Sequence, residues 1–161
     1  MLDLQCLRQR RATQAGMTLL ELVVACGILL VLSTAALPLA RMTVKRQKEA
    51  ELRHALREIR TAIDRYKDAA DRNLIRVEVG SEGYPPDLET LVRGVQLGAA
   101  GDRRVRFLRR IPVDSMTGQA DWGLRSVQDD PNSTSWGGKN VFDVYSRSTG
   151  TAIDGTRYAD W

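Results

Sequence analysis

The sequence is short of the residue types on which most catalytic and metal sites depend. Its 161 residues include one histidine, His54, and two cysteines, Cys6 and Cys26. Beyond residue 26 the chain therefore cannot form a disulfide, a thiol nucleophile or a cysteine metal site. It also has no glycine-rich phosphate loop, no His-Glu-x-x-His motif and no nucleophile elbow. His54 lies among charged residues without a recognisable catalytic partner, so the sequence predicts a protein that is not an enzyme.

A strong charge imbalance is also absent. The chain has 24 Lys and Arg against 20 Asp and Glu, a formal net charge of +4, which is typical of an ordinary solvated surface. Arginines are concentrated in residues 103–110, which could bind an acidic partner or nucleic acid. Phe107 is the only aromatic residue there, whereas single-strand sites stack bases on several aromatics. The favoured interpretation is a solvated loop and edge strand, whose charges discourage pairing with other chains.

One long hydrophobic run is present, at residues 16–40, and Glu21 is its only charge. About 20 apolar residues are enough to cross a bilayer as a helix, so we expect a membrane segment here. A carboxylate in such a segment is costly unless it lies near an end or is paired, which makes Glu21 a candidate functional residue. In an ordinary secretory signal the small-residue cleavage site follows the apolar core, but here Gly16 precedes it. Cleavage after Gly16 would leave the helix on the mature chain; a plain signal anchor is the alternative.

The residues from Gly16 to Glu21, read as GMTLLE, resemble the class III signal of type IV pilins and type II secretion pseudopilins. The resemblance implies that a prepilin peptidase cuts after Gly16 and methylates the new N-terminal residue, Met17. It also assigns assembly roles to Glu21, the fifth residue after the cut, and to Pro38, the 22nd. Met17 departs from the pattern, because phenylalanine is usual at that position.

We expect four segments along the chain: a leader over 1–16, a transmembrane and fibre-core helix over 17–40, an amphipathic helix over 41–75, and an α/β loop and sheet region over 76–161. Pro38 predicts a kink or local melting near Thr34. Apolar residues at i, i+3/i+4 and i+7 from Leu52 to Ala70 predict a buried stripe, and Glu49 is among the charged residues assigned to the wet face. The helix is expected to end between residues 71 and 74.

The rest of the chain predicts a short helix and short strands. Asp87 should cap a helix over 88–92 that ends at Gly94, and strands are expected over 124–127 and 141–145. Residues 129–140 are rich in Asp, Pro, Asn, Ser and Gly and are expected to form a loop. The predicted fold class is α+β: a long N-terminal helix packed on a small antiparallel sheet, as in pilins.

The soluble region resembles the major pseudopilins of type II secretion. The similar stretches are Tyr84-Pro85, residues 108–114, residues 142–146 and Asp154-Gly155, while residues 126–140 look like an insertion.

The resemblance to major pseudopilins also implies one calcium ion. Asp154 and Asp160 are the matching ligands, with main-chain carbonyls completing a shell of six to eight oxygens. Alternatively, Asp154-Gly155 is only a turn and Asp160 only a tail residue.

The expected function is a structural subunit of a type II secretion pseudopilus. It would wait in the inner membrane as a single-pass protein with a periplasmic domain, then join a helical fibre of many copies. The resemblance implies four kinds of partner: the prepilin peptidase, an assembly ATPase, an inner-membrane platform protein and minor pseudopilins. Three alternatives stay open: a type IV pilin on the cell surface, a minor pilin that binds DNA or another ligand through residues 103–110, and an enzyme tethered by a signal anchor.

Overall fold

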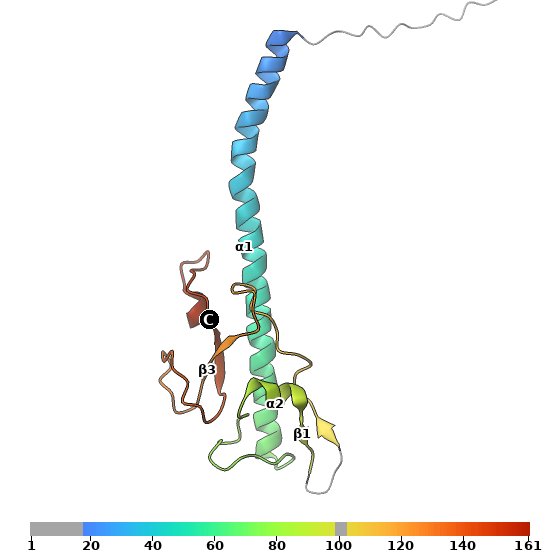
Figure 1. Cartoon of the computed structure of the whole chain (residues 1–161), viewed down its shortest axis with the longest axis vertical. Coiled ribbons are helices and arrows are strands. Elements are labelled where there is room, and N and C mark those ends of the chain that lie inside the picture. Colours follow the sequence, from blue (N-terminus) through green and yellow to red (C-terminus); the bar gives the residue numbers. More distant parts are fainter. Residues whose placement is uncertain (1–17, 99–102) are drawn as a thin grey trace, which may run out of the picture. The chain divides into compact units, whose positions relative to one another are not determined.

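The computed structural model describes residues 18–98 and 103–161, except for the side chains of residues 35–40. Gly16, Met17 and the side chain of Pro38 therefore lie outside the described part. The chain divides into two compact units, Met1–Arg41 and Met42–Trp161, and one helix, α1 (Leu19–Asp71), has residues in both (Figure 1). The fold is α+β, as predicted from the sequence.

Local capping explains both ends of α1. At its start the amide of Glu21 donates to Thr18 Oγ1 (3.2 Å) and the amide of Leu22 donates to the Thr18 carbonyl (3.1 Å), so Thr18 is the N-cap. At its end Asn73 adopts a left-handed conformation (φ 56°), and the amides of Asn73 and Leu74 donate to the carbonyls of Ala70 and Ala69. This is the Schellman arrangement that closes many helices. The predicted end between residues 71 and 74 is confirmed.

The backbone of α1 is helical through residue 38, so the local melting expected near Thr34 is wrong for this isolated chain. Proline at position 38 removes one backbone donor, but the turns on both sides keep their own hydrogen bonds and hold the helix.

The second half of α1 carries the core of unit Met42–Trp161. Its buried stripe includes Leu52, Ile59 and Ile63, each no more than 1% exposed. These side chains pack with buried residues of the later chain, among them Leu91, Trp122, Val141, Val144 and Tyr158. The predicted amphipathic stripe and its partner, the C-terminal part of the same chain, are confirmed. Glu49 was wrongly assigned to the wet face, because it is 9% exposed and its carboxylate binds groups of the C-terminal tail.

A short helix, α2 (Leu88–Arg93), follows the Tyr84-Pro85 turn. Asp87 caps it by accepting the amide of Thr90 (2.6 Å), as predicted. Gly94 ends it at φ 80°, and a Cβ there would lie 2.7 Å from the carbonyl of Val105, so this position requires glycine. The next strands, β1 (Val95–Gln96) and β2 (Arg104–Val105), form a two-stranded antiparallel sheet.

A second antiparallel sheet pairs β3 (Trp122–Arg125) with β4 (Asp143–Ser146), Trp122 opposite Ser146 and Arg125 opposite Asp143. Both strands were predicted, but each boundary was wrong by one or two residues. β3 stops before Ser126 because the Ser126 amide turns to Asp129, and β4 starts after Val141 because the Val141 amide bonds the carbonyl of Pro85. A 3-10 turn, η1 (Tyr158–Asp160), ends the described chain.

Candidate assembly site

The described helix of unit Met1–Arg41 has no polar face. Successive positions on a helix are rotated by about 100°, so a run of neighbouring apolar residues covers every side. Large hydrophobic residues here are all more than half exposed: Leu19, Leu20, Leu22, Val23, Val24, Ile28, Leu29, Leu30, Val31 and Leu32. A helix that is apolar all round is normally buried against other helices or in lipid. Among residues 18–98 and 103–161, none of the helices has the length and apolar content needed to cross a membrane.

Glu21 is the one ionisable group in the first turn of α1. Its amide donates a hydrogen bond to Thr18 Oγ1. Its side chain is exposed and forms no ion pair with any described residue. The positive end of the helix dipole favours an anion at this place. The Thr18-Leu19-Leu20-Glu21 spacing also matches the capping box, a local signal for a helix start directly after residue 18. The arrangement therefore presents a carboxylate that can accept a cation at the start of an apolar helix.

Two hydroxyls interrupt the apolar run, and each is satisfied within the helix. Ser33 Oγ donates to the carbonyl of Leu29 and Thr34 Oγ1 donates to the carbonyl of Val31, both at 2.7 Å. Such bonds let serine and threonine lie in apolar surroundings without an outside partner.

Residues 11–37 match a family model described as the prokaryotic N-terminal methylation motif. The chain is pilin-like. The match contains Gly16, Met17 and Glu21, the residues on which the resemblance was first based. Comparison of this pilin-like chain with curated proteins and with solved structures gives no match.

The stretches that resemble major pseudopilins contact one another in the folded unit. The Val141 amide donates to the carbonyl of Pro85 (2.8 Å), and the rings of Tyr84 and Phe142 meet edge to face at 5.3 Å. Asp114 is fully buried, and its Oδ2 accepts the hydroxyl of Ser146 (2.6 Å). These contacts hold the Tyr84-Pro85 turn and the loop at Asp114 to β4 and to the two residues before it.

The two predicted calcium ligands already have protein partners. Asp154 Oδ1 accepts the amide (3.0 Å) and hydroxyl (2.6 Å) of Thr156, and its Oδ2 lies 3.5 Å from Arg53. Asp160 accepts two bonds from Arg157, at 3.0 and 2.9 Å. Thr156 lowers the pKa of the Asp154 carboxyl, with Arg53 adding to the effect. Within the described residues no group of three Asp, Glu, His or Cys side chains could hold a metal ion.

A contact that the sequence did not predict fixes the tail. Glu49 Oε1 accepts the amide of Ile153 (2.9 Å) and the hydroxyl of Tyr158 (3.0 Å); we call this arrangement the Glu49 clasp. Burial, together with the neighbouring Glu49 carboxylate, raises the pKa of Tyr158 to about 12. The sequence does contain a pattern that indicates the burial of Glu49. It lies three residues before Leu52 and seven before Leu56, which is the spacing of the buried stripe.

Arginines of α1 hold the last described residue. Arg60 Nη2 donates to the main-chain oxygen of Trp161 (2.8 Å) while its Nε donates to Asp143 (2.7 Å). The Arg53 guanidinium stacks 4.2 Å from the Trp161 ring centre, and Tyr158 meets the same ring edge to face. Side chains of α1 therefore hold the tail in place.

Proposed function

We propose that this chain is a structural subunit of a type II secretion pseudopilus, processed at Gly16 and assembled through its N-terminal helix. The observation that carries the proposal is a methylation motif joined to a helix without a polar face. A chain built in this way can bury its apolar surface only against lipid or against other helices. Burial of one large apolar side chain contributes about 1.5–3 kcal/mol, so ten such residues supply a strong drive for association.

Cleavage after Gly16 creates one of the two charged groups of the proposed assembly contact. Hydrolysis of the Gly16–Met17 bond leaves a carboxylate on Gly16 and a free amine on Met17. The peptidase then transfers to this amine a methyl group from a sulfonium methyl donor, which leaves as the thioether, and one proton of the ammonium is released. The amine still carries a positive charge. When a neighbouring copy is displaced along the fibre, its Glu21 reaches this amine, and each charge offsets the desolvation of the other. The Glu21 side chain is available for this role because it has no ion pair with any described residue.

We further propose that the subunit waits in the inner membrane with unit Met42–Trp161 in the periplasm. An assembly ATPase and a platform protein would then move it into the fibre, with minor pseudopilins at its tip. Head-to-tail contacts between identical copies do not close on themselves and give an open helical fibre.

The pseudopilus is preferred to a surface pilus because of the short stretches that resemble major pseudopilins. Two of these stretches meet in the folded unit, where the hydroxyl of Ser146 donates to Asp114. Antibody labelling of intact cells distinguishes the two, since a surface pilus is labelled without opening the outer membrane and a periplasmic fibre is not.

The test uses the full chain produced together with a prepilin peptidase. Intact-mass measurement after membrane extraction should show loss of residues 1–16 and one added methyl group. Glu21→Ala should leave the protein processed and folded but without fibres by electron microscopy. Asp64→Ala, an exposed acidic residue elsewhere on α1, is the matched control and should assemble normally. A mature chain that starts at another residue, or normal fibres from Glu21→Ala, would contradict the proposal.

A further inference from the structure

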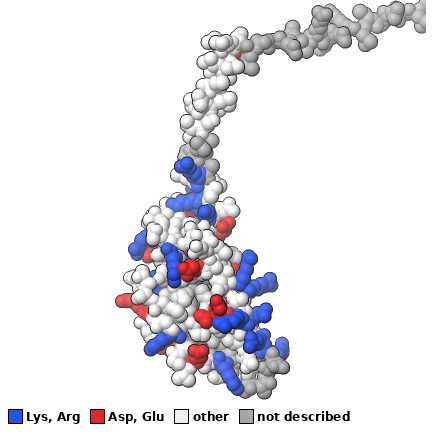
Figure 2. Space-filling view, in the orientation of Figure 1, with Lys and Arg blue, Asp and Glu red and all other residues white. Residues whose placement is uncertain are grey.

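A short basic segment of α1, residues 41–48, directly follows the apolar run; we call it the basic collar. Four cations lie there within two helical turns: Arg41, Lys45, Arg46 and Lys48. Lys45 is half-buried and the other three are exposed. No Asp or Glu occurs between Glu21 and Glu49. Figure 2 shows blue side chains at the upper end of unit Met42–Trp161, where its part of α1 begins.

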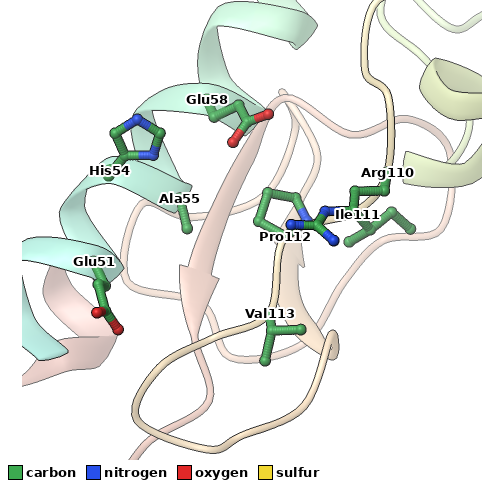
Figure 3. Close-up of a pocket in the computed structure, with 8 residues that line it drawn as sticks. All are labelled: Glu51, His54, Ala55, Glu58, Arg110, Ile111, Pro112 and Val113. Carbon is green, nitrogen blue, oxygen red and sulfur yellow. The ribbon is translucent and has the colours of Figure 1, made fainter.

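The first carboxylates after the collar are turned to other partners. Glu49 is buried and binds groups of the C-terminal tail. Glu51 Oε1 accepts a bond from Gln47 Nε2 (3.1 Å), and this glutamate lines a cavity of about 490 Å³ beside residues 110–113 (Figure 3). None of the four collar cations forms an ion pair within the part of the chain that the structure describes.

Exposed apolar side chains are interleaved with these cations. Met42 is 59% exposed and Val44 is 55% exposed. The arginines of residues 103–110 also lack ion pairs among the described residues, but they do not follow an exposed apolar run. An acidic protein or a nucleic acid would meet the charge of the collar without covering Met42 and Val44. The boundary region of a bilayer offers phosphate groups and acyl chains side by side, so it can satisfy both kinds of side chain.

We propose that the basic collar binds the headgroups of anionic phospholipids, with Met42 and Val44 against the adjoining acyl chains. The inference rests on the proposed function, because it requires the apolar half of α1 to enter a bilayer. In that topology the collar lies on the periplasmic side, where segments next to a membrane helix are usually poor in Lys and Arg. Anionic phosphodiesters at the membrane surface would compensate the four positive charges there.

The test measures which lipids contact the full chain in a bilayer. The chain is reconstituted in phosphatidylcholine with a trace of spin-labelled lipid, and electron spin resonance gives the protein-bound fraction of labelled phosphatidylglycerol and of labelled phosphatidylcholine. The wild type should prefer phosphatidylglycerol about tenfold (~1.4 kcal/mol) at low salt. The preference should disappear at about 1 M salt, because the Debye length falls to about 3 Å.

Two variants with the same loss of charge separate the collar from the rest of the chain. The collar variant should bind the two lipids equally, and it combines four changes: Arg41→Gln, Lys45→Gln, Arg46→Gln and Lys48→Gln. The control variant should keep the preference of the wild type, and it changes four exposed arginines of residues 103–110: Arg103→Gln, Arg104→Gln, Arg109→Gln and Arg110→Gln. Any contribution of residues 1–16 is the same in all three proteins.

Equal binding of the two lipids by the wild type, or a preference that the collar variant keeps, overturns the inference. Loss of the preference on adding inorganic phosphate at constant ionic strength also overturns it, because the collar would then be a site for free anions. Cleavage and fibres are scored separately by intact mass and electron microscopy. Correct cleavage and fibres without lipid preference reject only the inference. A collar-dependent preference in a chain that forms no fibres rejects the proposed function and leaves the inference standing, whereas a chain that carbonate washes from the bilayer rejects both.

Discussion

Removing the Glu49 carboxylate should loosen the C-terminal tail and destabilise the whole unit Met42–Trp161. Glu49 is 9% exposed and Tyr158 is 3% exposed, so neither group can turn to water without opening the core. Glu49→Ala leaves the hydroxyl of Tyr158 and the amide of Ile153 without their acceptor.

The magnitude follows from these two bonds. A hydrogen bond to a charged group contributes about 1.5–3 kcal/mol, which gives about 3–6 kcal/mol for the pair. Alanine also relieves the desolvation of a buried carboxylate, which offsets part of this loss. We expect a net loss of about 3 kcal/mol in the free energy of unfolding. At roughly 4 °C per kcal/mol for a unit of this size, Tm should fall by about 12 °C.

The assay is urea and thermal unfolding of unit Met42–Trp161, followed by tryptophan fluorescence, which includes the signal of Trp161 in the tail. Glu51→Ala changes an exposed glutamate two residues away and should stay within about 0.5 kcal/mol of the wild type. Glu49→Gln keeps an acceptor and should fall between the two. If Glu49→Ala matches Glu51→Ala, the Glu49 clasp contributes nothing and the reasoning is refuted.

Four other predictions can be tested. Because the folded pKa of Tyr158, about 12, lies above the ordinary 10, its contribution to stability should be complete below pH 10 and lost as pH rises through 12; phenolate absorbance of wild type against Tyr158→Phe measures this. The calcium site implied by the resemblance predicts a Tm several degrees higher with calcium than with chelator and the loss of most of this difference in Asp154→Ala, whereas an unchanged Tm rejects the site. Gly123→Ala should destabilise by about 1–3 kcal/mol, since its Cβ would lie 2.2 Å from the Tyr145 ring, and urea unfolding would show it. In the assembled fibre the helix around Pro38 should lose hydrogen bonds, so a fibre map with unbroken helical density there would disprove the last prediction.

Local chemistry explains what the sequence predicted well. The end of α1 near residue 71 and the cap at Asp87 depend on residues within one or two turns, so they can be found from spacing alone. The strand boundaries could not be found in that way. β4 begins two residues later than its alternating pattern because the amide of Val141 is used by Pro85, a partner 56 positions away.

The candidate site likewise contains residues that can be predicted from the sequence and residues that cannot. The methylation signal, with Glu21 inside it, occupies neighbouring positions and can be recognised directly, and the family match over residues 11–37 covers these positions. Glu49 was misassigned because charge suggested a solvated residue, while the groups that hold its carboxylate lie more than a hundred residues away in sequence.

The Glu49 clasp also sets an order of events during synthesis. The carboxylate lies near the start of unit Met42–Trp161, and its two donors, Ile153 and Tyr158, are 104 and 109 residues later. A nascent chain that has not reached residue 158 holds this glutamate without its donors, and Arg60 without the Trp161 oxygen 101 residues later. The core cannot close from its N-terminal side as the ribosome advances, and contacts of such long range fold slowly. The core of unit Met42–Trp161 can therefore close fully only after residues 158–161 have left the ribosome.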